Sequence, residues 1–542
     1  MIALLLKIGT LYVLWRIFRA YVVRSPLDNI PGPPSKSWKG VFPDIFNPDA
    51  WDFHRKMAET YGSVIRIKGL LGENLLYVFD PKAMHQILVK DQDIYEETAS
   101  FIAGNRLIFG HGLLSTTGEQ HRKQRRMLNP VFSIAHMRQM VPIFYHVTYK
   151  LRDALLNRVT NAPVEMDLLL WMNRTALELV GQSGLGYSFD SLEEDAATHR
   201  YSTSAKQLVP LLLKHQFPRT YLLPILVKIG SAQFRRRVLN MLPIKTLHKL
   251  RDIIDTMHGT SVEILESKKK ALEEGDEAVA HQVGQGKDIL SILLRANMEA
   301  SEDEKLSDEA VLAQISTLIF AAMDTTSGAL SRLFHLLATN PDVQSKLRAE
   351  IVESRKRFDG DLPYDQLVAL PYLDAVVRET LRLYGPVSVV MRATREDVVL
   401  PLSNPITGIN GEQIPEIFIP QNTKVIVGMR ASNTNAELWG PDSFEWKPER
   451  WLKPLPKGVV DAHLPGIYSN LMSFLGGGRS CIGFKFAQLE MKVVLSVLLE
   501  SMQFSPSDKK IFWQMNGIAS PTVDHVTNLN NQLPLIVERL KK

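Results

Sequence analysis

The spacing of apolar residues predicts a chain that is mainly α-helical. From about residue 140 to residue 340, apolar side chains recur at the three-to-four-residue period of a helix with one buried face. Shorter segments with the same period predict further helices at 51–62, 81–90, 371–384 and 484–500. The helix at 371–384 has a clear stop signal, because Gly385 and Pro386 follow it.

A minor β part is predicted from short apolar runs rich in β-branched residues. The predicted strands lie at 64–67, 75–79, 387–390, 398–400 and 425–427. The glycine-rich stretch 100–117 is expected to be a loop whose apolar side chains line a pocket or pack beneath it. The segment 271–287 has few large apolar residues and is expected to be an exposed loop, with a hidden domain boundary as the alternative.

The longest predicted helix begins after Ser307. The Ser307 hydroxyl can cap the helix, and the two acidic residues that follow place negative charge where the helix dipole favours it. The pattern continues to about Thr339, shortly before Pro341, so the helix would be about 50 Å long. A helix of that length crosses a whole domain.

The N-terminal segment 1–23 is mostly apolar and is interrupted by three basic residues. As a helix it would be about 35 Å long, which is enough to cross a bilayer. Arginines on its C-terminal side would keep that side in the cytosol. We therefore expect a single-span signal anchor, with an interfacial helix and a soluble or processed segment as the alternatives.

A proline-rich run at 30–34 follows this segment. Proline fixes φ and cannot continue a helix, so the run is expected to be a stiff spacer, or else a plain turn. This divides the chain into an anchor at 1–24, a hinge at 25–40 and a main domain at 41–542. The apolar segment 221–227, built around a proline, is expected to be either core or a second membrane contact.

The most informative feature of the composition is the number of cysteines. Of 542 residues, 45% are hydrophobic, so a large core is available. The single cysteine, Cys481, excludes an intramolecular disulfide, a cysteine-rich zinc site and an iron–sulfur cluster held by four cysteines. The net charge of +5 is too small to indicate nucleic-acid binding, and it leaves open an anionic membrane or an acidic protein partner.

Cys481 follows a run of three glycines, and Gly483 comes two residues after it. A glycine run lets the backbone approach a flat or bulky group closely, and a thiolate at its end suits a soft or redox-active metal. We therefore interpret Cys481 as a ligand of a haem iron. A buried free cysteine after a glycine loop is the alternative.

The same segment resembles the haem-binding loop of the cytochrome P450 superfamily. Its pattern, F-x-x-G-x-R-x-C-x-G, is matched at each fixed position by Phe474, Gly477, Arg479, Cys481 and Gly483. The resemblance implies the P450 fold with an N-terminal membrane-anchor helix, and haem b with an axial thiolate from Cys481. It also implies that Arg479 pairs with a haem propionate.

A second motif, E-x-x-R, is matched by Glu379 and Arg382, which the i,i+3 spacing places on one helix face as a plausible ion pair. Alone this is a common surface pattern. In the family, an arginine of a downstream P-E-R-W segment completes the cluster, and Arg450 stands at that position. The resemblance thus makes these three residues a structural support for the haem core.

A third motif lies in the middle of the longest predicted helix. Ala321 and Ala322 are small, and Asp324 and Thr325 are an acid and a hydroxyl in an apolar segment. Ordinary polar positions on a helix surface are the alternative. The segment resembles the family's oxygen-activation motif, with Ala322 in place of the usual glycine. The resemblance implies that Asp324 relays protons and that Thr325 holds the oxygen ligand or a water.

The family usually places W-x-x-x-R on a basic helix, where both side chains donate to a haem propionate. Here Arg125 matches, and His121 replaces the tryptophan. Histidine can also donate, but its charge changes with pH. Arg392 stands where the family often has another propionate-binding arginine, and Arg106 is a weaker candidate.

Candidate substrate-pocket residues are apolar and are placed mainly by analogy with the family. They are Phe101, Ile102, Leu107, Ile108, Leu318, Phe320, Ala321, Val387, Val389 and Val390. They imply an apolar small molecule as substrate. The amino-acid sequence around Cys481 is most similar to that of fungal microsomal members of the family, many of which oxidise terpenoids in secondary metabolism. A fatty acid, an alkane or a xenobiotic is the alternative substrate.

The resemblance implies a monooxygenase in the endoplasmic reticulum membrane that inserts one atom of O₂ into its substrate. The chain has no flavin or nicotinamide motif, so its electrons are expected from NADPH through NADPH–cytochrome P450 reductase, with cytochrome b5 as a further partner. A basic face for that partner could be formed by Arg122, Lys123, Arg126 and Lys485, although ordinary solvated charges explain each equally. The alternative functions are a haem-thiolate isomerase, lyase or dehydratase and a non-catalytic haem carrier or sensor.

Overall fold

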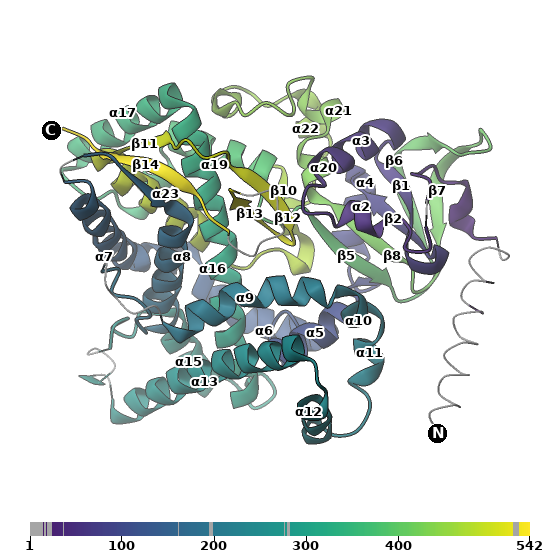
Figure 1. Ribbon diagram of the computed structural model, residues 1–542, viewed down its shortest axis with the longest axis horizontal. Coiled ribbons are helices and arrows are strands. Elements are labelled where there is room, and N and C mark those ends of the chain that lie inside the picture. The colour runs from purple at the N-terminus through teal and green to yellow at the C-terminus, as the bar shows by residue number, and fades with distance from the viewer. Residues whose placement is uncertain are drawn as a thin grey trace.

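The computed structural model describes residues 15, 18, 24–35, 37–160, 162–193, 199–275, 277–278, 282–523 and 531–541. The predicted anchor at 1–24 therefore lies almost wholly outside the described residues. Within them the chain is mainly helical with smaller sheets, as the hydrophobic pattern predicted (Figure 1).

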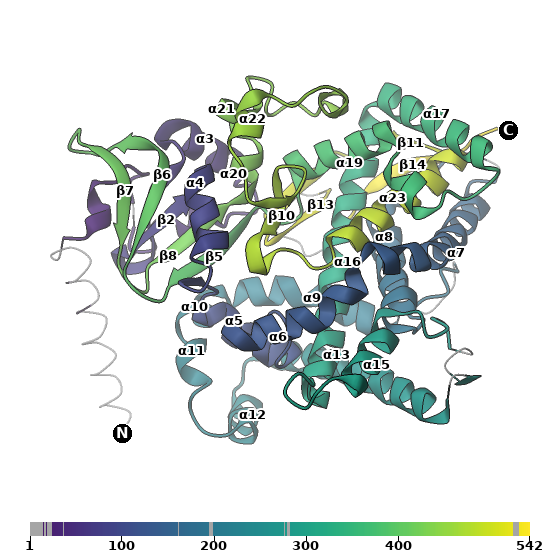
Figure 2. The same ribbon diagram turned by 180° about the vertical axis from the view of Figure 1, so that it is seen from behind.

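The longer helices gather in one large part of the molecule, and the principal sheet lies at its other end together with the short helices α2, α3, α4 and α20 (Figure 1, Figure 2). The α-helices are α2 (Phe42–Ile45), α3 (Trp51–Tyr61), α4 (Pro81–His85), α5 (Ala99–Phe109), α6 (Gly118–Leu128), α7 (Ile134–Arg158), α8 (Leu168–Leu179), α9 (Arg200–Lys214), α10 (Gln216–Tyr221), α11 (Leu223–Leu226), α12 (Ala232–Met241), α13 (Lys245–Glu274), α15 (Ile289–Glu299), α16 (Asp308–Thr339), α17 (Pro341–Phe358), α18 (Tyr364–Val368), α19 (Pro371–Tyr384), α20 (Met429–Asn433), α21 (Ala436–Trp439), α22 (Lys457–Asp461) and α23 (Phe484–Ser501).

The principal sheet has five strands in the order β1-β2-β8-β5-β3, with β2 and β8 parallel and the other pairs antiparallel. Four small sheets complete the β part. The strands are β1 (Val64–Lys68), β2 (Asn74–Val78), β3 (Tyr95–Glu96), β4 (Val164–Asp167), β5 (Val389–Thr394), β6 (Val398–Thr407), β7 (Gln413–Ile419), β8 (Lys424–Gly428), β9 (Gly466–Tyr468), β10 (Leu471–Gly476), β11 (Met502–Pro506), β12 (Phe512–Asn516), β13 (Ile518–Thr522) and β14 (Pro534–Arg539).

Helix α16 is the long helix that the sequence predicted, and it crosses the middle of the helical part (Figure 1, Figure 2). The Ser307 hydroxyl caps it by accepting a hydrogen bond from the Ala310 N–H. It contacts α8, α13, α19 and α23, and most of its apolar side chains are buried. Among the described helices it alone is long and apolar enough to cross a bilayer, but this burial makes it the core helix of the fold.

The prediction of a loop at 100–117 is wrong for the first half of that segment, which forms helix α5. Thr98 caps α5 by accepting from the Phe101 N–H, and Gly110 ends it with a φ of 84°. Within the helix, Gly104 faces the Arg219 side chain of α10. A Cβ at this position would lie 3.6 Å from the Arg219 Nε, an ordinary contact distance, so neither a turn nor close packing requires this glycine.

The loop expected at 271–287 begins later than predicted, because α13 continues to Glu274. Lys268 of α13 forms an ion pair with Asp288 at 2.9 Å, and both side chains are buried. This contact ties the end of the segment to the core, which favours a surface loop over a domain boundary.

Candidate functional site

The Cys481 loop connects a strand to a helix. Strand β10 leads into a 3-10 turn, Gly477–Arg479, and α23 begins at Phe484. The Cys481 N–H donates to the Phe474 carbonyl at 2.9 Å, which closes the turn. Gly477 has a φ of 68°, and a Cβ there would lie 1.7 Å from the carbonyl oxygen of Leu88. Glycine is thus required for close approach of the chain to itself.

The Cys481 side chain has accessible surface. The surrounding protein nevertheless removes much of the water around its thiol, and this burial raises the pKa of the thiol. The Gly483 N–H hydrogen-bonds the sulfur, and the charge of Arg125 lies nearby; both act to lower that pKa. A thiolate stabilised by a backbone N–H and a cation is suited to bind a haem iron. The residues present therefore fit a haem with Cys481 as its ligand.

Helix α6 brings His121 and Arg125 to this loop. Arg125 donates to both the carbonyl and the hydroxyl of Ser480, the latter at 3.1 Å, and it has no carboxylate partner among the described residues. Burial, together with the charges of Arg479 and Arg125, lowers the pKa of His121 to about 3. His121 is therefore neutral at physiological pH and can donate one hydrogen bond, so the pH-dependent charge expected from the sequence does not arise there.

Two further predicted cations lie beside them, each paired with a glutamate. Arg479 contacts Glu96 at 3.1 Å, and Arg392 of β5 contacts Glu97 at 2.9 Å. Burial raises the pKa of Glu97, whereas the neighbouring arginines act to lower it. With Arg125, three guanidinium groups face two carboxyl groups, so the site retains positive charge that suits an anionic haem propionate. Arg106 is exposed and donates to the Ser115 carbonyl at 3.4 Å.

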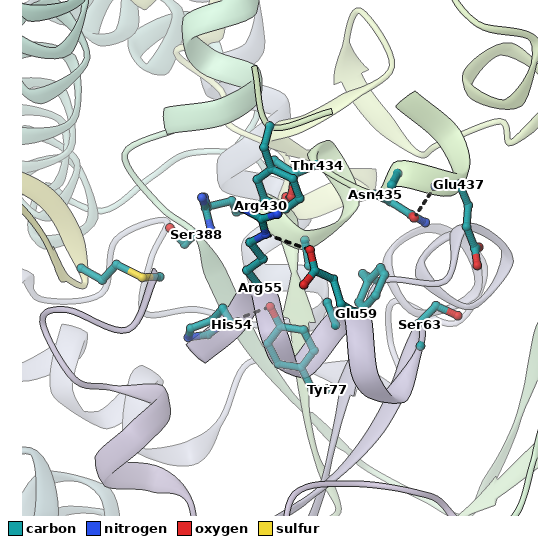
Figure 3. A pocket seen from close by; sticks show the side chains of 17 residues that line it. His54, Arg55, Glu59, Ser63, Tyr77, Ser388, Arg430, Thr434, Asn435 and Glu437 are labelled. Carbon is teal, nitrogen blue, oxygen red and sulfur yellow. Dashed lines mark hydrogen bonds and ion pairs between the residues drawn. The ribbon is translucent and has the colours of Figure 1, made fainter. Parts of the chain in front are cut away.

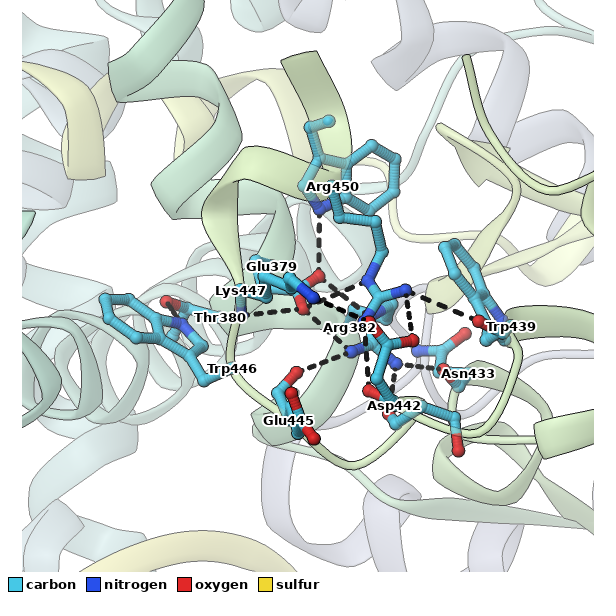
Figure 4. A network of polar contacts seen from close by, with 12 residues as sticks. Glu379, Thr380, Arg382, Asn433, Trp439, Asp442, Glu445, Trp446, Lys447 and Arg450 are labelled. Atoms are coloured by element: carbon cyan, nitrogen blue, oxygen red, sulfur yellow. Dashed lines mark hydrogen bonds and ion pairs between the residues drawn. The ribbon is translucent and has the colours of Figure 1, made fainter. Parts of the chain in front are cut away.

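Glu379 is the centre of a buried polar network (Figure 4). Its carboxylate accepts two hydrogen bonds from Arg382, each at 2.8 Å, and one from the Trp451 indole at 3.0 Å. Arg450 lies 3.4 Å away and also pairs with Asp442 at 2.9 Å. The network joins α19 to the P-E-R-W segment, which is the arrangement that the sequence predicted for these three residues.

Replacing Glu379 with Gln is expected to destabilise the protein by about 3–5 kcal/mol, because Arg382 would keep a buried charge without its partner. The matched control is Glu353→Gln, which breaks an exposed pair with Arg357 and is expected to cost less than about 0.5 kcal/mol. Urea unfolding of the haem-loaded protein measures both. Equal unfolding midpoints for the two variants would contradict the structural role of Glu379.

Asp324 and Thr325 lie in the middle of α16. The Thr325 hydroxyl donates to the Ala321 carbonyl at 2.8 Å, so its lone pairs can accept a hydrogen bond from water. Burial raises the pKa of Asp324 to about 6, and Lys206 of α9 acts against this rise. A carboxyl group with such a pKa exchanges protons readily near neutral pH, as a proton relay requires.

The predicted substrate-pocket residues occupy different environments. Phe320 of α16 contacts Phe109 of α5 in a tilted arrangement with ring centroids 5.0 Å apart, while Leu107 is 46% exposed. In β5, Val390 packs on the cluster that also holds Val387, whereas Val389 packs on the opposite cluster around β1 and β2. Strand alternation separates Val389 from Val390, while Val387 lies before the strand begins. The other members are buried or half-buried, except for Ala321, which is exposed: Phe101, Ile102, Ile108, Leu318 and Ala321.

Comparison with known proteins agrees with this geometry. The family model for cytochrome P450 matches residues 30–526. The chain is 53% identical to cytochrome P450 monooxygenase 91 of Postia placenta over 98% of both chains. It is 48% identical to the ganoderic acid synthetase of Ganoderma lucidum over 95% of both chains. This chain belongs to the cytochrome P450 family, and it is a monooxygenase of that family.

Sequence reasoning missed the partners of the predicted charges. Glu96 and Glu97 pair with Arg479 and Arg392 across nearly 300 residues or more of sequence, and the charge of Lys206 acts on Asp324 from another helix. No local spacing relates such residues. The only local sign of these partners was that Glu96 and Glu97 directly precede Thr98, which caps α5. Acidic residues at that place are also common at the start of exposed helices, so the pattern did not identify a pairing.

Proposed function

We propose that this monooxygenase hydroxylates a terpenoid of secondary metabolism in the endoplasmic reticulum membrane, with electrons from NADPH delivered by a separate reductase. The observation that supports the substrate class is the 48% identity to the ganoderic acid synthetase over nearly the whole chain. The apolar side chains of α5 and α16 support an apolar substrate.

When bound, the haem supplies the activation of O₂ and the insertion of oxygen. The chain would hold the group through Cys481, and Arg125, Arg392 and Arg479 would be available for its propionates. Asp324 takes up and releases a proton on its carboxyl group, and Thr325 orients a water through its hydroxyl. The Asp324–Thr325 pair favours a monooxygenase over an isomerase or a haem carrier, because those functions need no proton relay.

The membrane location is supported by the segment 216–244. Of the segment 221–227, which was expected to be either core or membrane contact, Leu222, Ile225 and Leu226 are exposed, the other residues are half-buried, and none is fully buried, which supports the membrane alternative. Basic side chains at Lys228 and 235–237 flank this apolar surface, as in helices that lie at a membrane interface. The exposed apolar residues are Phe217, Leu222, Ile225, Leu226, Ile229, Phe234, Val238, Met241, Leu242 and Ile244.

The reductase is supported mainly by the absence of a flavin or nicotinamide motif from the sequence. The basic residues of α6 give weaker support for a reductase-binding surface than the sequence suggested. Arg122 pairs with Asp93 and Glu119, and Arg126 pairs with Glu119 and Glu304, so much of their charge is balanced. Lys123 donates to the Asp303 carbonyl, and Lys485 lies over the Phe484 ring.

The test is expression of the full chain with NADPH–cytochrome P450 reductase in microsomes, followed by binding spectra and product analysis. A triterpenoid is expected to shift the haem absorption band and to yield a hydroxylated product that requires NADPH. A shift and product only with fatty acids, alkanes or aromatics would contradict the terpenoid assignment. Recovery of the chain in the supernatant after a high-salt wash would contradict the membrane location.

A further inference from the structure

A cavity of about 280 Å³ lies between α3, β2, α20 and β12 (Figure 3). Among the described residues that line it, none was predicted to bind haem, relay protons or contact substrate. Its buried lining includes His54, Tyr77 and Ser388, while Arg55 and Glu59 are exposed at the rim. The cavity is thus distinct from the haem site, although Ser388 belongs to the segment that leads into β5.

Arg430 projects from α20 into this cavity beside Ser388 (Figure 3). Its Nε donates to the Leu383 carbonyl at 3.3 Å, and its guanidinium lies 4.8 Å from the centre of the Trp51 ring. Within the described part of the chain, neither of its terminal amino groups has a hydrogen-bond partner, and no carboxylate lies within 4 Å. The Ser388 hydroxyl is likewise without a partner in those residues. These donors line the cavity without an acceptor from the described part of the protein and are reached by water, because neither residue has a fully buried polar atom that lacks a partner.

A second unpaired guanidinium lies close by. Arg332 is only 8% exposed, and it lies 3.5 Å from the centre of the Trp513 ring and 4.2 Å from that of Tyr384. No acidic side chain of the described residues pairs with it. Burial, and to a smaller extent the charge of Arg430, holds the pKa of Arg332 well below its usual value. Cation–π contacts offset only part of the cost of the buried Arg332 charge, and the half-buried Arg430 adds a second positive charge nearby.

The other polar groups of the cavity do not supply the missing negative charge. His54 Nε2 contacts the Ile45 carbonyl at 3.0 Å, so Nε2 carries the proton and Nδ1 accepts from the Tyr77 hydroxyl at 3.2 Å. Burial lowers the pKa of His54, which keeps the ring neutral. At the rim, Glu59 is paired with Arg55 at 2.8 Å, and Glu437 lies exposed to water.

We propose that this cavity binds a small amphipathic carboxylate, a ligand site separate from the monooxygenase centre. The carboxylate accepts hydrogen bonds from the two amino groups of Arg430 and from the Ser388 hydroxyl, because a planar guanidinium matches two carboxylate oxygens. The apolar part of the ligand lies against Phe79 and Met515, which also line the cavity. A volume of about 280 Å³ lies near the small end of the range of ligand pockets, which suits a short chain of about eight carbons.

The test uses octanoate as the probe, with 1-octanol as its uncharged counterpart. Calorimetric titration is performed on the haem-loaded enzyme after saturation with an azole inhibitor, so that the distal haem site is blocked. Octanoate is expected to bind, and octanol to bind at least tenfold more weakly. Arg430→Gln is expected to weaken octanoate binding at least tenfold, and Ser388→Ala by about fivefold, because charged and neutral hydrogen-bond donors are lost respectively.

The matched control is Arg138→Gln, which removes an exposed arginine paired with Asp365 at 2.8 Å beside a different cavity. Octanoate affinity is expected to be unchanged in that variant. Thermal unfolding without ligand separates a folding defect from a binding defect, and Ser388→Ala keeps the test decisive should Arg430→Gln be unstable. Equal octanoate affinity in the wild type and in both cavity variants, or octanol binding as tightly as octanoate, would overturn the proposal.

Discussion

Replacing Cys481 with Ala is expected to abolish both the red-shifted absorption band of the ferrous carbon monoxide complex and all NADPH-dependent product formation. The band depends on a thiolate opposite carbon monoxide, and Cys481 is the only cysteine in the chain, so no other residue can provide the sulfur. The Gly483 N–H that hydrogen-bonds the sulfur would then lose its acceptor. Difference spectroscopy of purified protein, normalised to haem content, measures the band.

The matched control for this change is Ser480→Ala at the neighbouring position. It removes one of the two acceptors of Arg125 but leaves the sulfur in place, so the band is expected to persist. Circular dichroism of both variants shows whether the fold is kept. Persistence of the red-shifted band in Cys481→Ala would disprove the assignment of the ligand.

The parts of the site that the sequence predicted well depend on short-range geometry. Glu379 and Arg382 are three residues apart on one helix, so their pairing follows from helical spacing alone. The Ser307 cap and the end of α16 at Thr339 likewise follow from local signals. The family resemblance then added Arg450, which no local rule connects to Glu379.

The parts that the sequence did not predict depend on contacts between distant segments. The unpaired charge of Arg430 depends on the packing of α20 beside α3 and β12. The sequence alone does not distinguish an arginine in a cavity from one on the surface. The glycine-rich stretch 100–117 suggested a loop, but its first half forms helix α5, which packs against α10 and α11. In β5, the face of each valine depends on the register with β8, which a short apolar run does not specify.

Replacing Asp324 with Asn is expected to lower the fraction of NADPH electrons recovered in product and to raise hydrogen peroxide release. Removing a positioned proton donor typically slows a reaction about 10²-fold or more. Because the pKa of Asp324 is about 6, its protonated fraction falls about tenfold per pH unit above that value. The coupling of the wild type is therefore expected to decline between pH 6 and pH 8, and the Asn variant to lose this inflection. Thr325→Ala is expected to uncouple turnover in the same direction.

Asp324→Asn also distinguishes an effect on catalysis from an effect on the stability of the fold. Folding raises the pKa of Asp324 from 3.8 to about 6, so ionised Asp324 opposes folding at neutral pH. The stability that this carboxyl group contributes when protonated is present below pH 3.8 and is lost as pH rises through about 6, a difference of at most about 3 kcal/mol. Asp324→Asn is therefore expected to unfold at a higher urea concentration at pH 7 than the wild type, although it is the poorer catalyst. Reduced stability together with unchanged coupling would instead indicate that Asp324 is only a packing residue of α16.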